Sequence, residues 1–389
     1  MIFMNVRKTY NLSDICRFVT SRTCNIENYI STENMLPNKG GITFPSNIPS
    51  GSAIAYQLGD VLISNIRPYF QKIWQANCDG ACSADVLCIR ANEKADCKYL
   101  YYLLSQQKFF DYVMSGAKGC KMPRGDKSQI MQWQISLPPL AEQKRIADIL
   151  SAIDDKIELN RRINANLEQQ AQALYKSWFV DNKKDDWKEV PLSEVADFVG
   201  GYSYKGNELV ESSMTAMATI KNFERKGGFK VDGFKDIVAS NKLKAEHHAN
   251  LFDILVAHTD LTQNADVIGN AEMLLTFDKY SDIIFSMDLV KVLPKQTFPY
   301  KYLLAALLKN PHFKKHCMGY VNGTTVLHMS KKALPEYVIN LPSAEEIQSM
   351  DNAFKAYYLK MAEILQENNS LSTLRDTLLP KLMSGEITV

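Results

Sequence analysis

One segment of the chain carries positive charges at a regular interval where no regular helix can form. Its cations recur every three residues and are Lys118, Lys121, Arg124 and Lys127. Glycine and proline inside the segment favour a loop. A loop with four cations can offer amide donors and charge to phosphate groups, and an arginine can contact a guanine edge. A solvated loop without a role is the plain alternative.

A second polar loop lies 204 residues later, the offset that also separates the similar strands Gln-Ile-Ser-Leu-Pro at 134–138 and Val-Ile-Asn-Leu-Pro at 338–342. Its polar residues are Thr324, Thr325, His328, Lys331 and Lys332. At this offset Thr325, His328 and Lys331 stand opposite Lys121, Arg124 and Lys127. One loop position with two different polar sets is what two modules that read different sequences would need.

Other polar side chains that can contact a nucleic acid follow predicted strands. In the first half they are Arg67, Tyr69 and Lys72, which can clamp a phosphate backbone. A strand end with a salt-bridged arginine explains that segment equally well. In the second half they are Ser203, Lys205, Thr259, Thr262 and Gln263. Side chains of these types can read bases, but they also make ordinary turns.

Known catalytic and cofactor motifs are absent from the sequence. There is no Gly-rich dinucleotide or Walker loop, no Asn-Pro-Pro-Tyr or Asp-Pro-Pro-Tyr signature of an amino-methyltransferase and no Gly-x-Ser-x-Gly elbow. Cys78, Cys82, Cys88 and Cys97 lack a second close pair, which favours structural thiols over zinc. His312 and His316 lack the glutamate of a His-Glu-x-x-His site, which favours surface histidines. We therefore predict no cofactor, no metal and no catalytic residue.

Length and composition indicate a folded chain with more than one core. At 389 residues, with 46% apolar and 23% charged residues, two domains are the natural expectation. No apolar stretch is long enough to span a membrane, and no signal-peptide pattern opens the sequence. We therefore expect a cytoplasmic protein with reduced cysteines. Residues 1–140 hold 15 Lys/Arg against 10 Asp/Glu, and residues 181–342 hold 20 of each. A modest positive charge is compatible with nucleic acid but does not establish it.

The element that must position both loops is a long helix after Pro138-Pro139. Apolar and amide residues recur there in alternating steps of four and three, which is a coiled-coil seam. The seam is Ile146, Leu150, Ile153, Ile157, Asn160, Asn164, Leu167, Ala171, Leu174 and Trp178. About 38 residues at 1.5 Å each give a rod of roughly 57 Å.

The partner of this seam lies at the C-terminal end of the chain. The offset of 204 places it on Met350, Phe354, Tyr357, Met361, Ile364, Asn368, Leu371, Arg375, Leu378 and Leu382. We predict that the two helices pack antiparallel. The seam asparagines either fix the register of the pair or lie where the helices splay apart.

The order of elements recurs on both sides of the central helix. The sequence favours a short helix with a Ser13 cap, strands at 60–64 and 84–89, a helix from Tyr99 to Tyr112 and a closing strand. We predict an α+β fold of two mixed α/β globules in tandem repeat, 1–140 and 181–342. Long helices at 141–180 and 343–389 follow them and form an antiparallel coiled coil.

Several segments together resemble the specificity subunit of type I restriction-modification systems. They are Leu-Pro-Pro-Leu-Ala-Glu-Gln-Lys-Arg-Ile-Ala-Asp-Ile-Leu from 137, Leu-Asn-Arg-Arg-Ile-Asn-Ala-Asn-Leu-Glu from 159, Leu-Val-Ala-His-Thr-Asp-Leu-Thr-Gln-Asn-Ala-Asp-Val-Ile-Gly from 255 and Leu-Arg-Asp-Thr-Leu-Leu-Pro-Lys-Leu-Met-Ser-Gly-Glu-Ile from 374. The resemblance implies that each globule is a target-recognition domain for one half of an asymmetric bipartite double-stranded DNA site. It also implies that the helices space the halves. The second post-strand segment departs from the pattern, since Leu-Pro-Ser-Ala-Glu-Glu-Ile-Gln replaces Pro-Pro-Leu-Ala-Glu-Gln-Lys.

The same resemblance implies partners and a division of labour. Two modification subunits would bind S-adenosylmethionine and methylate adenine, and restriction subunits would supply ATP-dependent translocation and cleavage. This chain would recognise DNA without catalysing a reaction. One rival hypothesis is a protein scaffold with two globules on a coiled-coil strut that does not bind DNA. Another is an enzyme with an unrecognised site. A specificity ratio between DNA sequences excludes the scaffold, and turnover by the purified chain alone would favour the enzyme.

Overall fold

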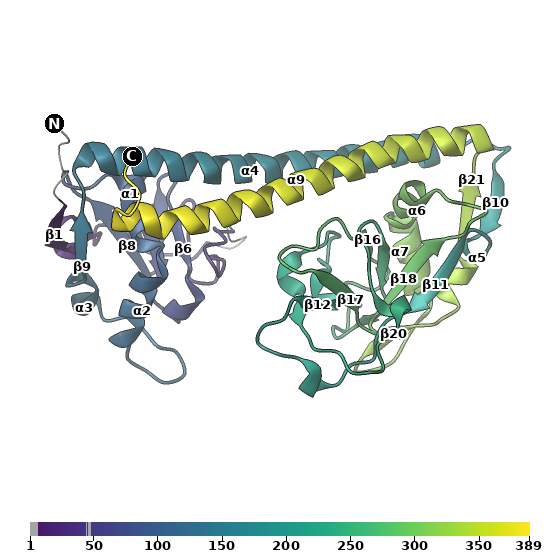
Figure 1. Cartoon of the computed structure of the whole chain (residues 1–389), viewed down its shortest axis with the longest axis horizontal. Coiled ribbons are helices and arrows are strands. Elements are labelled where there is room, and N and C mark those ends of the chain that lie inside the picture. Colours follow the sequence, from purple (N-terminus) through teal and green to yellow (C-terminus); the bar gives the residue numbers. More distant parts are fainter. Residues whose placement is uncertain (1–6, 44, 46–47) are drawn as a thin grey trace. The chain divides into compact units, whose positions relative to one another are not determined.

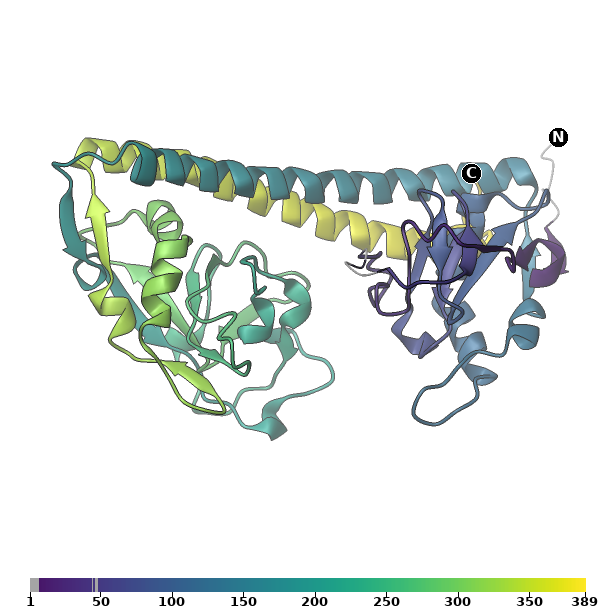
Figure 2. The same ribbon diagram turned by 180° about the vertical axis from the view of Figure 1, so that it is seen from behind.

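The computed structural model describes residues 7–43, 45 and 48–389. The chain forms two compact units (Figures 1 and 2). Unit 1 comprises Met1–Ile157 and Leu371–Val389, and unit 2 comprises Glu158–Ser370. Both units contain parts of the two long helices, α4 (Leu140–Lys176) and α9 (Ala344–Ser384). Within the described residues, no helix has the length and apolar character needed to cross a membrane.

Unit 1 is built on two small antiparallel sheets and a strand pair. The sheets have the orders β2-β8-β5-β6 and β3-β4-β7, and β1 pairs with β9. The strands are β1 (Lys8–Asn11), β2 (Cys16–Phe18), β3 (Arg22–Thr23), β4 (Ala53–Tyr56), β5 (Val61–Ser64), β6 (Ile73–Gln75), β7 (Gly80–Cys82), β8 (Val86–Ala91) and β9 (Gln134–Leu137). The short helices are α1 (Cys97–Leu104), α2 (Gln107–Ser115) and α3 (Lys127–Met131). Every residue of β5 is buried, so this strand lies at the centre of the unit.

Unit 2 repeats this plan with insertions. Its four-stranded sheet has the order β11-β18-β14-β16, and β10 pairs with β21. The remaining sheets are β13-β12-β17 and β15-β20-β19. The strands are β10 (Lys188–Pro191), β11 (Ala196–Gly200), β12 (Thr215–Ala218), β13 (Lys235–Asp236), β14 (Ile254–Ala257), β15 (Thr259–Asp260), β16 (Ala271–Met273), β17 (Asp282–Phe285), β18 (Leu289–Pro294), β19 (Val321–Asn322), β20 (Leu327–Met329) and β21 (Val338–Leu341). The short helices are α5 (Leu192–Val195), α6 (Lys301–Leu308), α7 (Pro311–Met318) and α8 (Ala333–Glu336).

The internal repeat holds at the level of strand register. Leu137 of β9 pairs with Lys8, and Leu341 of β21 pairs with Lys188. The partners on β9 and β21 are 204 residues apart, the offset expected from the sequence. The predicted α+β fold, with two repeated mixed modules and two paired long helices, is confirmed.

Two local predictions were wrong. The expected helix from Tyr99 to Tyr112 is two helices, α1 and α2, with a break after Leu104. The Ser105 hydroxyl donates to the Tyr101 carbonyl, and the Gln106 side chain donates to the Leu103 carbonyl, which closes the end of α1. The expected cap at Ser13 is also wrong. The turn at Leu12–Asp14 is a 3-10 helix whose N-cap residue is Asn11.

The long helices pair antiparallel in each unit. In unit 2 the Asn160 amide donates to Asn368 Oδ1 at 2.9 Å, and Asn164 donates to the Met361 carbonyl at 3.3 Å. In unit 1 the Arg375 guanidinium contacts Asp154 at 2.9 Å. Partner numbers fall on one helix as they rise on the other, as antiparallel packing requires. The asparagines therefore bond across the pair, and Asn160 is 1% exposed.

Apolar contacts follow the predicted seam and extend it. Each predicted seam residue is buried or half-buried. Tyr358, Leu379 and Met383 are buried on α9 as well, although the repeat did not predict them. Leu379, Leu382 and Met383 belong to the core of unit 1, together with Ile146 and Leu150 of α4. The end of α9 therefore completes a core that is formed mainly by residues before 157.

The Glu-Gln pair at the start of α4 fastens unit 1 internally. Arg7 donates to Glu142 at 2.9 Å and to the Met383 carbonyl at 2.5 Å. Gln143 accepts from the Asp96 amide at 3.0 Å and donates to the carbonyls of Lys94 and Pro138 at 3.0 and 2.9 Å. Glu142 and Gln143 are buried. Glu142 and Gln143 therefore hold the start of α4 against the rest of unit 1.

Replacing Gln143 by alanine leaves the half-buried amide of Asp96, the carbonyl of Lys94 and the buried carbonyl of Pro138 without their partner. We expect Gln143→Ala to lower the free energy of unfolding by about 2–4 kcal/mol, since each unsatisfied buried polar group costs about 1–3 kcal/mol. Gln169→Ala is the control, because Gln169 is exposed on the same helix. Urea unfolding of the full chain measures both. Equal stability of the two variants would contradict the structural role of Gln143.

Candidate nucleic-acid interface

The same backbone pairing occurs in both units where the central strand ends. In unit 1, Arg124 pairs with Ile66 on one side and with Lys118 on the other. In unit 2, His328 pairs with Thr259 on one side and with Asn322 on the other. Arg124 and His328 therefore occupy equivalent positions, as the offset of 204 predicts.

The unit 1 loop forms a hairpin that is closed by backbone hydrogen bonds between Lys118 and Arg124. Lys118 and Arg124 exchange both backbone hydrogen bonds at 3.0 Å, and the Arg67 amide donates to the Pro123 carbonyl at 2.8 Å. The loop joins α2 to α3, and Figures 1 and 2 draw it at the end of unit 1 remote from α4. The Asp126 carboxylate caps α3 by accepting from the amides of Ser128 and Gln129. The hairpin therefore presents its side chains from a defined backbone.

Carboxylates hold two of the four predicted cations. Arg124 lies 3.2 Å from Asp85, and 52% of its side chain remains exposed. Lys118 contacts Asp126 at 2.8 Å, and this hydrogen bond is the main reason why the pKa of Asp126 is lowered. Lys121 and Lys127 are exposed. Asp85 was missed from the sequence. It follows β7 and precedes β8, so only the strand pairing brings it to this edge.

Polar atoms without partners gather at the same edge. Within the described residues, Asn65 Oδ1 and Arg67 Nε are buried and lack a hydrogen-bond partner. Arg67 also has a φ of +52°, which is unfavourable for a residue with a side chain and more so before a proline. Strain and unsatisfied polar atoms together are typical of a ligand-binding edge.

Tyr69 and Lys72, the other two predicted contact residues of unit 1, differ in their surroundings. Tyr69 is exposed beside Phe70, with ring centroids 4.7 Å apart. Lys72 is half-buried, and its ammonium donates to the Thr32 carbonyl at 2.8 Å. Lys72 therefore holds an internal loop in this structure.

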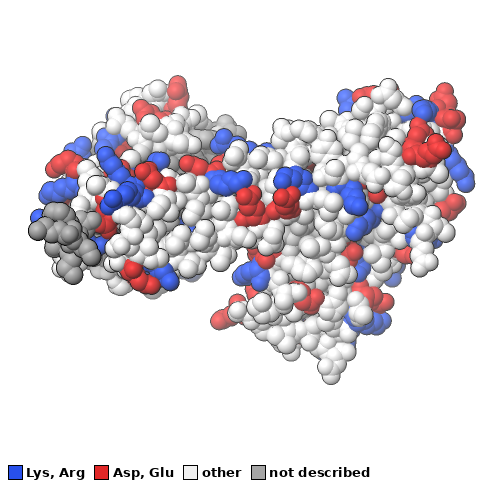
Figure 3. Space-filling model, turned by 45° about the horizontal axis from the view of Figure 1, so that its top comes forward, with Lys and Arg blue, Asp and Glu red and all other residues white. Residues whose placement is uncertain are grey.

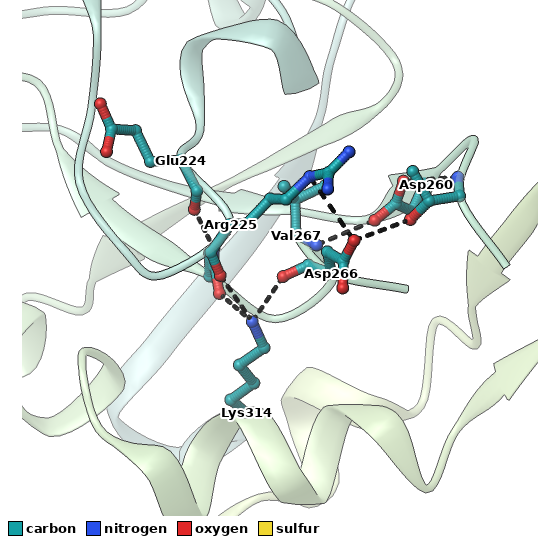
Figure 4. Close-up of polar contacts among 8 residues, drawn as sticks. Glu224, Arg225, Asp260, Asp266, Val267 and Lys314 are labelled. Carbon is teal, nitrogen blue, oxygen red and sulfur yellow. Dashed lines mark hydrogen bonds and ion pairs between the residues drawn. The ribbon is translucent and has the colours of Figure 1, made fainter. Parts of the chain in front are cut away.

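In unit 2, one buried carboxylate orders the loop after β15. Asp260 accepts from the amides of Thr262 and Val267, both at 2.8 Å, and Figure 4 shows the bond to Val267. Gln263 donates to the Thr324 carbonyl at 2.9 Å. The loop 260–267 and the loop 322–329 are thus joined into one surface.

The remaining predictions for unit 2 divide by exposure. The exposed residues are Ser203, Lys205, Gln263, Thr324, Thr325, His328, Lys331 and Lys332. Thr262 is half-buried. Thr259 is only 4% exposed, and its hydroxyl donates to Asp288 at 3.0 Å. The side chain of Thr259 therefore supports the fold, and its contact with a nucleic acid stays a prediction. Ser203 and Lys205 lie on a separate segment after β11.

The alternative metal sites find little support in the geometry. Among the described residues, no group of three or more His, Cys, Asp or Glu side chains is arranged around a common point. Hydrogen bonding with Cys82, followed by burial, raises the pKa of the Cys88 thiol, so that thiol stays protonated. His316 is half-buried and contacts the Ala333 carbonyl at 2.8 Å, so the prediction of a surface histidine is wrong there. His312 is exposed.

The charge on the surface is locally mixed. Figure 3 shows one face of the molecule, on which Lys and Arg side chains in blue are interspersed with Asp and Glu side chains in red. A mixed surface agrees with the net charge of +2. Any recognition of a polyanion therefore depends on local groups of cations rather than on the charge of the whole chain.

The left-handed backbone at Arg67 has a measurable consequence. Glycine carries no penalty in this conformation, whereas a residue with a Cβ loses about 1–2 kcal/mol. We expect Arg67→Gly to be more stable than Arg67→Ala by about 1 kcal/mol, measured by urea unfolding. The opposite order is expected at the control Arg17, which is exposed in strand β2, where glycine is unfavourable. A less stable glycine variant at position 67 would count against strain.

Comparisons with known proteins identify the architecture. Residues 7–169 match the family described as the type I restriction modification DNA specificity domain. The chain is 25% identical to the type I restriction enzyme HindI specificity subunit of Haemophilus influenzae, over 98% of this chain and 99% of that protein. It is 26% identical to the MjaVIII specificity subunit of Methanocaldococcus jannaschii, over 77% of this chain and 72% of that protein.

A solved structure shares the fold over the whole length. The type I restriction-modification S subunit from M. genitalium superimposes with a TM-score of 0.56 at 15% identity, over 98% of each chain. The repeated modules, the paired helices and the sequence relatives agree. Residues 7–169 thus match the DNA specificity domain of type I restriction-modification systems, and nearly the whole chain is similar to a specificity subunit of such a system.

Proposed function

We propose that this chain recognises an asymmetric, bipartite double-stranded DNA site, with one half read by each repeated module. The observation that carries the proposal is the shared backbone position of Arg124 and His328. Equivalent positions with different chemistry suit two readers of different sequences. Residues 1–140 and 181–342 would be the target-recognition domains.

The two edges offer different contacts to a major groove. Arg124 can donate to both acceptors of a guanine edge, the commonest specific arginine contact. His328 and Thr325 can donate or accept singly, which suits other bases. Lys121, Lys127, Lys331 and Lys332 are exposed near these positions and would contact phosphates, which fix the orientation of the protein on DNA.

A specificity subunit is a recognition component and not an enzyme, so the reactions belong to its partners. We infer that two modification subunits dock on the helices and modules and that they extrude and methylate the target adenine, because its amine is out of reach inside a stacked duplex. Restriction subunits would then join for translocation and cleavage. Assembly on host DNA implies a cytoplasmic location.

Single substitutions at the two equivalent positions test the division of labour. Arg124→Ala should cost about 1–3 kcal/mol of discrimination at one half-site and nothing at the other, because one bidentate base contact is lost. His328→Ala should affect only the opposite half. Methylome sequencing of a host with the complete system defines the site, and competition with duplexes altered in one half measures discrimination at fixed salt. A uniform loss of affinity for all sequences would make Arg124 a phosphate contact only.

The rival scaffold function has a direct control in the same assay. The assembled wild-type complex is compared on the target duplex and on a random duplex of equal length. Recognition predicts a specificity ratio of roughly 10³ or more. A ratio near one would support a scaffold that recruits proteins and would refute DNA recognition by this chain.

We further propose that α4 and α9 act as a ruler between the half-sites. A heptad inserted in both helices adds about 10 Å at 1.5 Å per residue. At 3.4 Å per base pair, the spacer in the recognised sequence should lengthen by roughly three base pairs. Selection of the preferred spacer from a library of spacer lengths measures this. An unchanged preference with normal affinity would refute the ruler.

A further inference from the structure

A hollow in unit 2 is lined by several cations that lie close together in the sequence. Its volume is about 560 Å³, and four positive side chains from ten consecutive residues line it. They are Lys221, Arg225, Lys226 and Lys230, and all are exposed. Glu224 and Asp232 line it too, so the local balance is positive by two charges. This group lies within residues 181–342, where the charges sum to zero.

Buried polar side chains hold the segment that carries these cations. Asn222 is fully buried, accepts from the Thr219 amide at 2.8 Å and donates to the Lys230 carbonyl at 2.8 Å. Phe223 and Phe229 pair across the hairpin. Gly227 and Gly228 form its turn at φ of +92° and +117°, which other residues rarely adopt.

The base of the hairpin is fixed by α7 and by the neighbouring loop. Lys314 donates to the carbonyls of Asp266 and Arg225 at 2.5 and 3.4 Å, as Figure 4 shows, and to Asn270 at 2.8 Å. Asn270 in turn donates to the Glu224 carbonyl at 2.7 Å. The cations therefore project from a preorganised backbone, which reduces the entropy lost on binding an anion.

The hollow adjoins the recognition edge of the same unit. Arg225 lies 3.6 Å from Asp266, in the loop that also carries Thr262 and Gln263 (Figure 4). Val267, whose amide is held by Asp260, is part of the lining of the hollow. A ligand in contact with loop 260–267 therefore lies beside Arg225 and the hollow. The backbone of a duplex carries a phosphate beside every base that is read.

We propose that this hollow binds the phosphate backbone of the DNA beside the half-site read by the second module. The inference rests on the proposed function. It explains how a recognition domain without net charge holds a polyanion, since the positive charge is concentrated in one rigid hairpin. Bases would be read by loops 260–263 and 324–328, and Lys221–Lys230 would fix the register of the duplex on unit 2.

The salt dependence of binding tests the hollow. Arg225→Gln combined with Lys226→Gln should lower the slope of log K against log[salt] by about 1.8, because each lost phosphate contact contributes about 0.9. Affinity for target and random duplexes should fall by the same factor, so the specificity ratio stays unchanged. The assay uses the full chain assembled with its modification subunits and duplexes of about three helical turns.

A matched control removes the same charge elsewhere on the unit. Lys242→Gln combined with Lys279→Gln replaces two exposed lysines outside the hollow and should leave the slope unchanged. The single variant Lys226→Gln, expected to lower the slope by about 0.9, covers the case in which the double variant is unstable. If the wild type binds its target and both hollow variants keep the wild-type slope, the phosphate-binding role of the hollow is refuted. The proposed recognition of DNA by the chain would then still stand. Loss of assembly in place of a slope change would indicate an acidic protein partner and also overturn it. Failure of the wild type to discriminate would refute the proposed function itself.

Discussion

The structure depends on the antiparallel pairing of two long amphipathic helices. An isolated helix of 37 residues would expose its whole apolar stripe, and burial of each large side chain contributes about 1.5–3 kcal/mol. In unit 1 the stripe of α9 enters the core through Leu379 and Leu382. In unit 2 it does so through Met350 and Phe354. The helix pair therefore belongs to the cores of both modules and is more than a connection between them.

Polar contacts select one register from the several that an apolar stripe would accept. Asn160 meets Asn368, and Asp154 accepts from both Arg375 and Tyr102 of α1. Lys309, at the end of α6, lies between Glu168 of α4 and Glu272 of β16. Burial alone would lower the pKa of Lys309, but the charges of Glu272 and Glu168 outweigh burial and raise it. A buried ion pair of this kind adds little net stability, because the cost of desolvating the charges offsets their attraction. These polar contacts join each module to its own stretch of helix in one orientation.

The parts of the fold that repeat could be predicted from the sequence, because a repeat is visible there without knowing which residues are in contact. The seam and the equivalence of Arg124 and His328 follow from one offset. The break between α1 and α2 did not, since Ser105 and Gln106 end α1 through side-chain bonds to its own carbonyls, without glycine or proline. Asp85 and the buried position of Thr259 depend on strand pairing between distant residues. The cationic hollow was not predicted, because the net charge of residues 181–342 does not show where the charges gather.

The bonds from Arg7 to the end of α9 have a consequence for biosynthesis. They join residues 375 positions apart, and closing a loop of that length costs about 5 kcal/mol of chain entropy. The ribosome makes the residues up to 157 first, but the α9 residues that finish the core of unit 1 follow only after all of unit 2 has been made. A chain truncated before α9 ends would lack them, although every residue up to 157 had been made correctly. The first module therefore reaches its full stability only after the end of α9 has been translated.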